Sequence, residues 1–262
     1  MRLTSIFGML GLANATTLLL PLYIWPGPGN PQNWASVFSA LASYPTVSFT
    51  IIVNPDSGPG SSPGPDSDYA PALARLNSYQ NARVIGYVHT SYGSQSASAL
   101  NANVTHWQNW NNYAQTAGNQ NTTISGIFFD ETSTANSKVT YMNNAAAFAK
   151  STLKPSGGAT PYVVYNPGTS ERQSYFNSNV NLIVQFEDTL ANYDTDNPAA
   201  GIPPSEVSQT AFIGNTASGK ASDVTKNVKS AKAQGFGGIY FSADCCYDSD
   251  LSLVSTVAAA LV

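Results

Sequence analysis

The stretch GIFFDETS, residues 126–133, joins an apolar run to two neighbouring carboxylates, Asp130 and Glu131. The run is rich in residues that favour β-strands, and its apolar character predicts a buried strand that ends at the two acids. The whole chain carries only 15 acidic residues, so a pair at the end of a buried strand indicates a functional site rather than a device for solubility.

Seven further apolar runs of the same kind recur along the chain. The eight expected strands begin near residues 18, 46, 82, 124, 161, 181, 210 and 237, and segments with helical spacing begin near 33, 68, 139 and 221. Apolar strands that alternate with helices predict a parallel sheet covered on its outer face. Eight such units predict an α/β fold, a single-domain (β/α)8 TIM-type barrel over residues 16–262. A doubly wound open sheet is the alternative, but no G-x-G-x-x-G turn follows the first strand.

Two further segments are interpreted as parts of this barrel. The Pro/Gly/Ser tract at residues 54–68 is expected to be a loop, because strand and helix patterns resume on both sides of it. The apolar tail at residues 251–262 has the length of a closing helix. A lipid-anchor signal is the alternative for this tail, but no clear polar spacer precedes it.

The N-terminus has the order of residues found in secretory signals. An apolar stretch over residues 6–12 is followed by the small residues ANA at 13–15, which predicts a signal peptide over residues 1–15. An ordinary N-terminal strand or helix is the alternative. Glycosylation sequons at Asn103 and Asn121 agree with secretion. No other apolar run reaches the length of a membrane span, so an extracellular or cell-wall protein is expected.

Composition excludes several kinds of site. Charged residues make up 10% of the chain, the formal net charge is -4, and no basic cluster is present, which argues against a nucleic-acid partner. With only His89 and His106 as histidines, neither a metal site nor a cofactor is expected. The adjacent Cys245 and Cys246 are either a vicinal disulfide or two free thiols.

Polar residues stand at the expected carboxyl ends of several strands, where barrel enzymes carry their catalytic groups. The alternation of side chains predicts that Asp130 and Phe128 point into the barrel mouth, and that Glu187 shares a face with Gln185 and Ile183. Two carboxylates on different strands, about 5 to 10 Å apart, are the catalytic groups that glycoside hydrolases use. Capping of the following helices, or pairing with Lys and Arg, is the alternative for such acids.

Aromatic and polar residues near the strand ends are candidates for contacts with a sugar. Amphipathic rings stack on pyranose faces and present hydroxyl groups, although about half of these aromatic residues are expected to be structural, with Tyr87 and Tyr240 as candidates for packing. The candidate substrate-binding residues are Tyr23, Trp25, His89, Tyr92, Tyr165, Asn166, Tyr240 and Asp244.

Four motifs, taken together and in order, resemble the spherulin-4-like, spherulation-specific family, whose members are associated with fungal glycoside hydrolases of family 135. The motifs are GYVHTSYG at 86–93, GIFFDE at 126–131, YNPGT at 165–169 and FED at 186–188. The resemblance implies a secreted (β/α)8 barrel that cleaves an α-1,4-linked polysaccharide of the galactosaminogalactan type at bonds within the polymer. The residues around Asp244, with the CC pair, depart from the family pattern.

The resemblance also implies roles for three acids. Asp130 and Glu131 stand where the paired acids of the family stand, and Glu187 stands where its third acid stands. By analogy with related retaining barrels, Asp130 is expected to be the nucleophile and Glu187 the acid/base, with Glu131 assisting. The alternative is a noncatalytic carbohydrate-binding or wall-associated structural protein on the same barrel. A serine hydrolase is disfavoured because no G-x-S-x-G motif is present.

Overall fold

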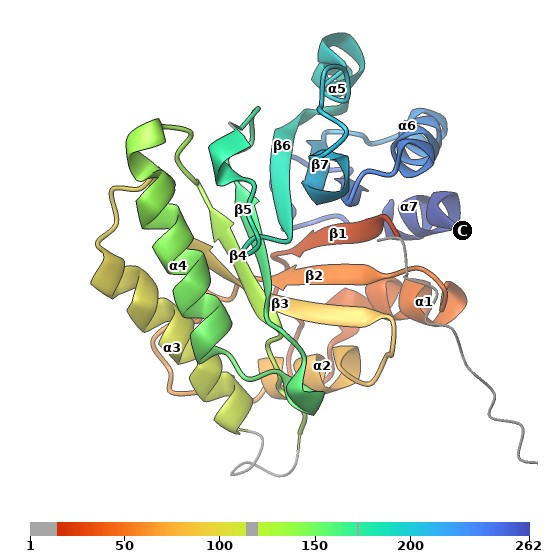
Figure 1. The fold of residues 1–262 in the computed structure, drawn as a ribbon. Helices are drawn as coiled ribbons and strands as arrows, with labels where there is room; N and C mark the ends of the chain where they lie inside the picture. The colour runs from red at the N-terminus through yellow and green to blue at the C-terminus, as the bar shows by residue number, and fades with distance from the viewer. Residues whose placement is uncertain (1–14, 114–119, 172) are drawn as a thin grey trace, which may run out of the picture.

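The computed structural model describes residues 15–113, 120–171 and 173–262, and these form a closed barrel of eight parallel strands in chain order (Figure 1). The strands are β1 Thr17–Leu22, β2 Phe49–Val53, β3 Ala82–His89, β4 Gly126–Asp130, β5 Tyr162–Asn166, β6 Leu182–Thr189, β7 Thr210–Asn215 and β8 Gly238–Phe241. Pairing of β1 with β8 closes the sheet. The predicted (β/α)8 barrel is therefore confirmed.

Helices surround the barrel on its outside (Figure 1). In the described part of the chain the α-helices are α1 Ala35–Ser43, α2 Tyr69–Leu76, α3 Ala97–Tyr113, α4 Val139–Thr152, α5 Leu190–Asp196, α6 Ala221–Gln234 and α7 Val254–Leu261. Short 3-10 helices are η1 Gln32–Trp34, η2 Asn136–Lys138, η3 Ser156–Gly158, η4 Gln173–Tyr175 and η5 Val207–Gln209. In the connection from β5 to β6, the described residues form one short 3-10 helix, η4, and no α-helix.

The eight strands divide the apolar residues between two cores. Inside the barrel, residues such as Leu19, Ile52 and Phe128 pack on one another. On the outer face, Phe129 packs edge to face against Tyr165, with ring centroids 6.2 Å apart, within the larger core between sheet and helices. The predicted alternation along β4 is therefore confirmed.

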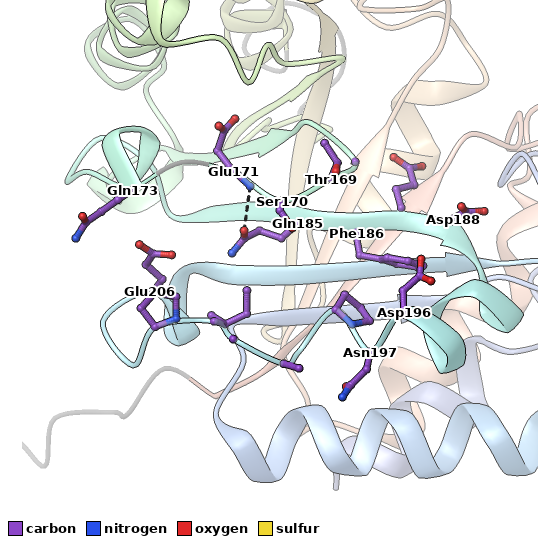
Figure 2. A pocket seen from close by; sticks show the side chains of 17 residues that line it. Thr169, Ser170, Glu171, Gln173, Gln185, Phe186, Asp188, Asp196, Asn197 and Glu206 are labelled. Atoms are coloured by element: carbon purple, nitrogen blue, oxygen red, sulfur yellow. Dashed lines mark hydrogen bonds between the residues drawn. The ribbon is translucent and has the colours of Figure 1, made fainter.

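The prediction for the faces of β6 was wrong in its register. Val184 points into the barrel core and Ile183 into the outer core, and the pairing with β7 shifts between Val184 and Phe186. Gln185 occupies this bulge, and its side-chain oxygen accepts a hydrogen bond from the Glu171 amide at 3.0 Å (Figure 2). Because a bulge adds one residue to a strand, Glu187 returns to the inner face with Val184 instead of sharing one with Ile183.

The remaining segments follow the sequence interpretation where the structure describes them. Residues 54–68 form a loop between β2 and α2, and α7 closes the barrel at the C-terminus, with Val257 fully buried. The expected signal peptide lies outside the described residues except for Ala15, so it stays a prediction. Within the ranges that the structure describes, no helix is long and apolar enough to span a membrane.

Candidate active site

Asp130 and Glu187 are linked at the barrel mouth by one side-chain amide. Asn166 Nδ2 donates to Asp130 Oδ1 at 2.7 Å and to Glu187 Oε2 at 2.5 Å. These two oxygens are therefore at most about 5.2 Å apart, the sum of the two distances. The other Asp130 oxygen, Oδ2, accepts a hydrogen bond from the Tyr87 hydroxyl at 2.7 Å.

The register of three neighbouring strands brings these groups level with one another. His89 on β3 pairs with Asp130 on β4, which in turn pairs with Asn166 on β5. Since the strands are parallel, their carboxyl ends meet at one rim, and polar side chains there share an opening. Tyr87 lies two residues before His89 on the same face, and its long side chain reaches the level of Asp130.

The chain after β5 holds Glu187 next to Asn166. Gly168 adopts a φ of +66°, a left-handed conformation that glycine takes without steric cost. Its amide donates to Asn166 Oδ1 at 3.0 Å, and its carbonyl accepts from the Glu187 amide at 3.0 Å. One turn therefore orients both the bridging amide and the second carboxylate.

The environment of Glu187 favours its protonated form. Burial raises the pKa of this carboxyl, and the negative charge of Asp130 raises it further, while the hydrogen bond from Asn166 acts in the opposite direction. A carboxyl that keeps its proton to a higher pH is suited to act as a general acid. Asp130 instead accepts hydrogen bonds on both oxygens, from the Tyr87 hydroxyl and from Asn166 Nδ2.

Three tyrosine rings line the mouth beside the carboxylates. Tyr23 packs edge to face against Tyr87, with centroids 5.6 Å apart, and against Tyr247, with centroids 5.9 Å apart. Burial raises the pKa of the Tyr23 phenol, and the charges of Asp130 and Glu187 raise it further. The phenols therefore stay protonated and remain available as hydrogen-bond donors.

Glu131 and His89 lie at the same rim. Strand β4 ends at Asp130, and Glu131 turns away with a φ of +52°, while its carbonyl accepts hydrogen bonds from the Tyr92 amide and the Thr90 hydroxyl, each at 2.7 Å. The half-buried His89 ring contacts Ser91 and Gln95 at 3.1 and 3.2 Å.

Two predicted contact residues present large exposed rings. Trp25 is 47% exposed and Tyr92 is 66% exposed, which is unusual for aromatic residues that serve only packing. Trp25 and Tyr23 line a hollow of about 330 Å³ with residues 55–66 of the loop after β2.

The structure places three other predicted contact residues away from the mouth or in a different role. Tyr165 is 1% exposed and donates its hydroxyl to the Met142 carbonyl of α4 at 2.7 Å, because alternation puts it on the outer face of β5. Tyr240 is also only 1% exposed, so its ring is out of reach of a sugar. Asp244 caps the turn after β8, where it accepts from the Ser249 amide and hydroxyl at 2.9 and 2.7 Å. We therefore remove these three from the candidate sugar contacts.

Tyr87 is the group that the sequence interpretation missed. It was considered a packing residue, but its hydroxyl bonds to Asp130. The available signal was its spacing of two residues from His89, which places both side chains on the inner face of β3.

A second hollow of about 650 Å³ borders Glu187 on the other side. It lies along β6 between the chain after β5 and residues 196–206, and Figure 2 shows the acidic side chains Glu171, Asp188, Asp196 and Glu206 around it. The β5–β6 connection, whose described residues form no α-helix, lines one side of the hollow.

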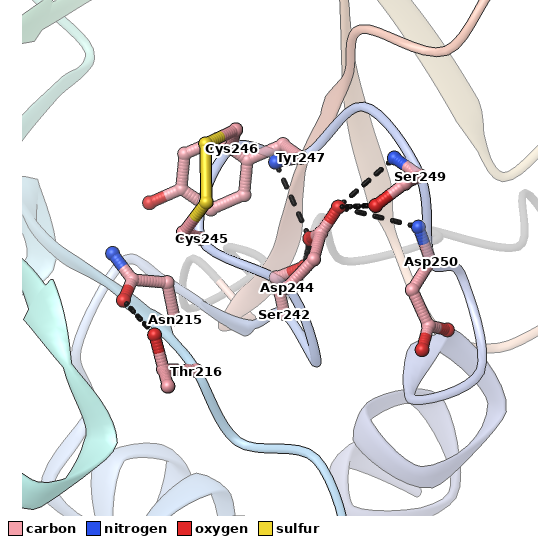
Figure 3. The surroundings of a disulfide bond; sticks show 9 residues. All are labelled: Asn215, Thr216, Ser242, Asp244, Cys245, Cys246, Tyr247, Ser249 and Asp250. Carbon is pink, nitrogen blue, oxygen red and sulfur yellow. Dashed lines mark hydrogen bonds between the residues drawn. A yellow bond between two sulfur atoms is a disulfide. The ribbon is translucent and has the colours of Figure 1, made fainter.

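The cysteine pair forms a vicinal disulfide between Cys245 and Cys246 (Figure 3), which decides between the two possibilities left open by the sequence. Among the described residues, no three His, Cys, Asp or Glu side chains lie together in a way that could hold a metal ion.

These observations define a class of protein, a (β/α)8 barrel with a hydrogen-bonded carboxylate pair at the carboxyl-end rim. Within that class, the chain belongs to spherulation-specific family 4, whose sequence profile matches residues 17–261. Spherulin-4 of Physarum polycephalum is 32% identical over 259 residues, covering 93% of this chain and 69% of the relative.

Comparison with solved structures agrees with this assignment. Sph3 of Aspergillus clavatus, solved in complex with GalNAc, matches with a TM-score of 0.83 and 28% identity over 95% of this chain and 98% of its own. The chitinase RmChi1 of Rhizomucor miehei matches with a TM-score of 0.51 and 13% identity over 94% of this chain and 99% of its own, a likeness of fold alone.

Proposed function

We propose that this protein is a secreted glycoside hydrolase that cleaves an α-1,4-linked polysaccharide containing galactosamine or N-acetylgalactosamine, of the galactosaminogalactan type, and acts within the chain. The observation that carries the proposal is the separation of Asp130 Oδ1 from Glu187 Oε2, at most about 5.2 Å. Retaining glycosidases place their two carboxyl groups about 5 to 5.5 Å apart, and inverting enzymes about 6.5 to 9.5 Å apart.

The surroundings of the two acids support a division of roles. Glu187, whose pKa is raised by burial, donates its proton to the glycosidic oxygen as the bond to the anomeric carbon breaks. Asp130 attacks that carbon and forms a covalent glycosyl-enzyme intermediate. Glu187, now ionised, removes a proton from a water molecule that displaces Asp130 and releases the product with its original anomeric configuration.

The substrate class is proposed from family membership and from the ligand of a relative. Sph3, which shares 28% identity and nearly the whole chain length, was solved with GalNAc. The exposed rings of Trp25 and Tyr92 near the rim are suited to stack on sugar units, and hollows on two sides of the mouth suit a chain that extends beyond one unit. Glu131, whose charge contributes to the raised pKa of Tyr87 after burial and Asp130, is proposed to assist.

The proposal is tested by assaying release of reducing ends from galactosaminogalactan. We expect Asp130→Asn and Glu187→Gln each to reduce kcat by about 100-fold to 10,000-fold or more, because each removes a group that acts in the transition state. The matched control is Asp223→Asn, since Asp223 lies in the first turn of α6, on the outside of the barrel (Figure 1). Wild-type activity in either site variant would refute the assignment, and binding of the polymer without cleavage by the wild type would favour a carbohydrate-binding protein.

A further inference from the structure

The hollow of about 650 Å³ beside Glu187, called the β6 hollow below, has an acidic lining. It is lined by residues 168–171, 173, 185–188, 196–198, 200–203 and 206, and its volume is typical of ligand pockets. Five of these residues are Asp or Glu, and none of the described lining residues is Lys, Arg or His. The charge of the lining therefore suits a cationic ligand.

Glu206 is the acid of this lining that is buried without a partner. It is 6% exposed, and its carboxylate makes no hydrogen bond or ion pair with any described residue. Burial alone raises the pKa of this carboxyl, with no contribution from a neighbouring donor or cation. A buried carboxylate is costly unless a cation or a hydrogen-bond donor pairs with it. Its place on the wall of the β6 hollow (Figure 2) points to a partner that a ligand supplies.

The backbone of Glu206 is fixed by the contacts that also form the bulge in β6. Its carbonyl accepts a hydrogen bond from the Thr210 hydroxyl at 3.0 Å, and this hydroxyl accepts from Gln185 Nε2 at 2.8 Å. The Glu206 amide donates to the Pro203 carbonyl at 2.8 Å. Because the same bulge directs Glu187 toward the mouth, the two carboxylates are held in a fixed relation by one set of hydrogen bonds.

The β6 hollow is elongated and begins at the proposed catalytic acid. Glu187 lines it, and Figure 2 shows Asp188 and Glu206 at opposite ends of it. A polysaccharide chain that passes Glu187 can therefore enter the hollow, and a unit farther along the chain reaches Glu206. This continuity with the site favours a sugar unit of the substrate over a basic segment of another protein.

We infer that the β6 hollow is a binding subsite for an unacetylated galactosamine unit, whose ammonium group pairs with the Glu206 carboxylate. Phe186 and Ile202 offer apolar surface to the C–H face of the sugar ring, and the exposed amide of Gln173 offers hydrogen bonds to its hydroxyl groups. This inference rests on the proposed function and adds to it a preference for a partly deacetylated polymer.

The test measures binding in a variant that does not consume the ligand. In an Asp130→Asn background, calorimetry gives the dissociation constants of two α-1,4-linked oligosaccharides of equal length, one fully N-acetylated and one partly deacetylated. Adding Glu206→Gln is expected to weaken binding of the partly deacetylated oligosaccharide about tenfold, the effect of one lost hydrogen bond to a charged group. Binding of the acetylated oligosaccharide should weaken much less, since that ligand has no ammonium group.

Matched controls separate the ion pair from changes in net charge and in stability. Asp223→Asn, in the first turn of α6, removes the same charge outside the β6 hollow and should leave both dissociation constants unchanged. Sodium chloride at about 0.5 M should reduce the difference between the two ligands in the parent, because salt screens ion pairs. Glu206→Gln should melt no lower than the parent at neutral pH, since it replaces a buried carboxylate that has no described partner.

The outcomes distinguish the two proposals. Binding of the partly deacetylated oligosaccharide within twofold of the parent in Glu206→Gln, or equal weakening of both ligands, would overturn the subsite while leaving the proposed function standing. Binding of an oligolysine peptide, lost in Glu206→Gln, by a parent that shows no preference for the partly deacetylated oligosaccharide would assign the hollow to a basic protein segment instead. Absence of binding of both oligosaccharides by the parent would overturn the proposed function, and the subsite with it.

Discussion

At the scale of single residues, Asn166 connects the two acids of the site. Its side chain is 4% exposed, and its one amide nitrogen donates to both Asp130 and Glu187. Carboxylates this close repel each other when both are ionised. A shared donor between them stabilises the charged forms and fixes the separation on which the proposed chemistry depends.

Replacement of Asn166 by Ala is expected to change the pH dependence of catalysis. The hydrogen bond from Asn166 lowers the pKa of Glu187, so its loss lets Glu187 keep its proton to a higher pH. The basic limb of the profile of kcat/KM against pH should therefore move to higher pH, and the maximum should fall about tenfold to 100-fold because the acids lose their shared donor. Asn192→Ala, which removes the donor to exposed Asp188, is the control, and an unmoved basic limb in Asn166→Ala would contradict this role.

Glu187 is also expected to reduce the stability of the fold as the pH rises. Its native pKa lies above the ordinary value of 4.5, so below pH 4.5 the carboxyl is protonated in both folded and unfolded chains and has no effect. As the pH rises above 4.5 and through the native pKa, the carboxyl ionises freely in the unfolded chain, whereas burial opposes its ionisation in the folded chain. The free energy of unfolding therefore falls over this range of pH. The melting temperature of Glu187→Gln should therefore equal that of the wild type in acid and exceed it at neutral pH.

A control of opposite sign is available next to Glu187. The pKa of Asp188 is lowered by its hydrogen bonds from Asn192 and Thr189, so Asp188→Asn should lower the melting temperature at neutral pH rather than raise it. A Glu187→Gln variant that is less stable than the wild type at neutral pH would show that the buried carboxylate is better solvated than the structure indicates.

The sequence predicted part of the site at this scale, and the residues show where its limits lie. Asp130, Glu187 and Asn166 were identified because each follows an apolar strand and the strand ends of a parallel barrel meet. Tyr165 was wrongly predicted to contact the sugar because it directly precedes Asn166. The pattern of residue types along a strand does not by itself tell which of two neighbouring side chains faces inward. Tyr87 was missed because its spacing of two residues from His89 places it on the inner face of β3 but does not reveal that its hydroxyl reaches Asp130.

At the scale of the elements, the bulge in β6 determines the direction of Glu187. An unbroken strand would place Glu187 on the face of Ile183, in the outer core. The bulge at Gln185 depends on bonds to Glu171 and to the Thr210 hydroxyl, at 3.0 and 2.8 Å. These partners are distant in the sequence, so strand periodicity alone did not reveal the extra residue.

Glycine on β3 fixes how closely α3 packs on the barrel behind the site. A Cβ at Gly86 would lie 2.4 Å from Trp107, whose indole also donates to the Tyr87 carbonyl at 2.9 Å. We expect Gly86→Ala to lower the free energy of unfolding by about 1 to 3 kcal/mol through overpacking, measured by urea denaturation. Combined with Trp107→Leu, which removes the obstructing ring, the same substitution should cost clearly less, and an equal cost in both backgrounds would exclude the clash as its cause.

At the scale of the whole molecule, closure of the sheet converts separate strand ends into one opening. The eight strands, the helices that begin near residues 33, 68, 139 and 221, and the closing helix α7 were predictable because each carries a local pattern of apolar residues. The disulfide at residues 245–246 was left open by the sequence, since adjacency permits a bond without requiring one. The separation of the two acids was also beyond the sequence, because it depends on Asn166, Gly168 and the β6 bulge acting together.

The central claim is that Asp130 and Glu187 face one shared opening at a separation suited to a double displacement. The most direct measurement is proton NMR of the first reducing ends released from the α-linked polymer, recorded before the anomers equilibrate. The account predicts that the new ends appear as the α-anomer, the configuration of the bond that was cut. Initial appearance of the β-anomer would contradict it, since inversion requires room for water between the carboxylates that a separation of at most about 5.2 Å does not provide.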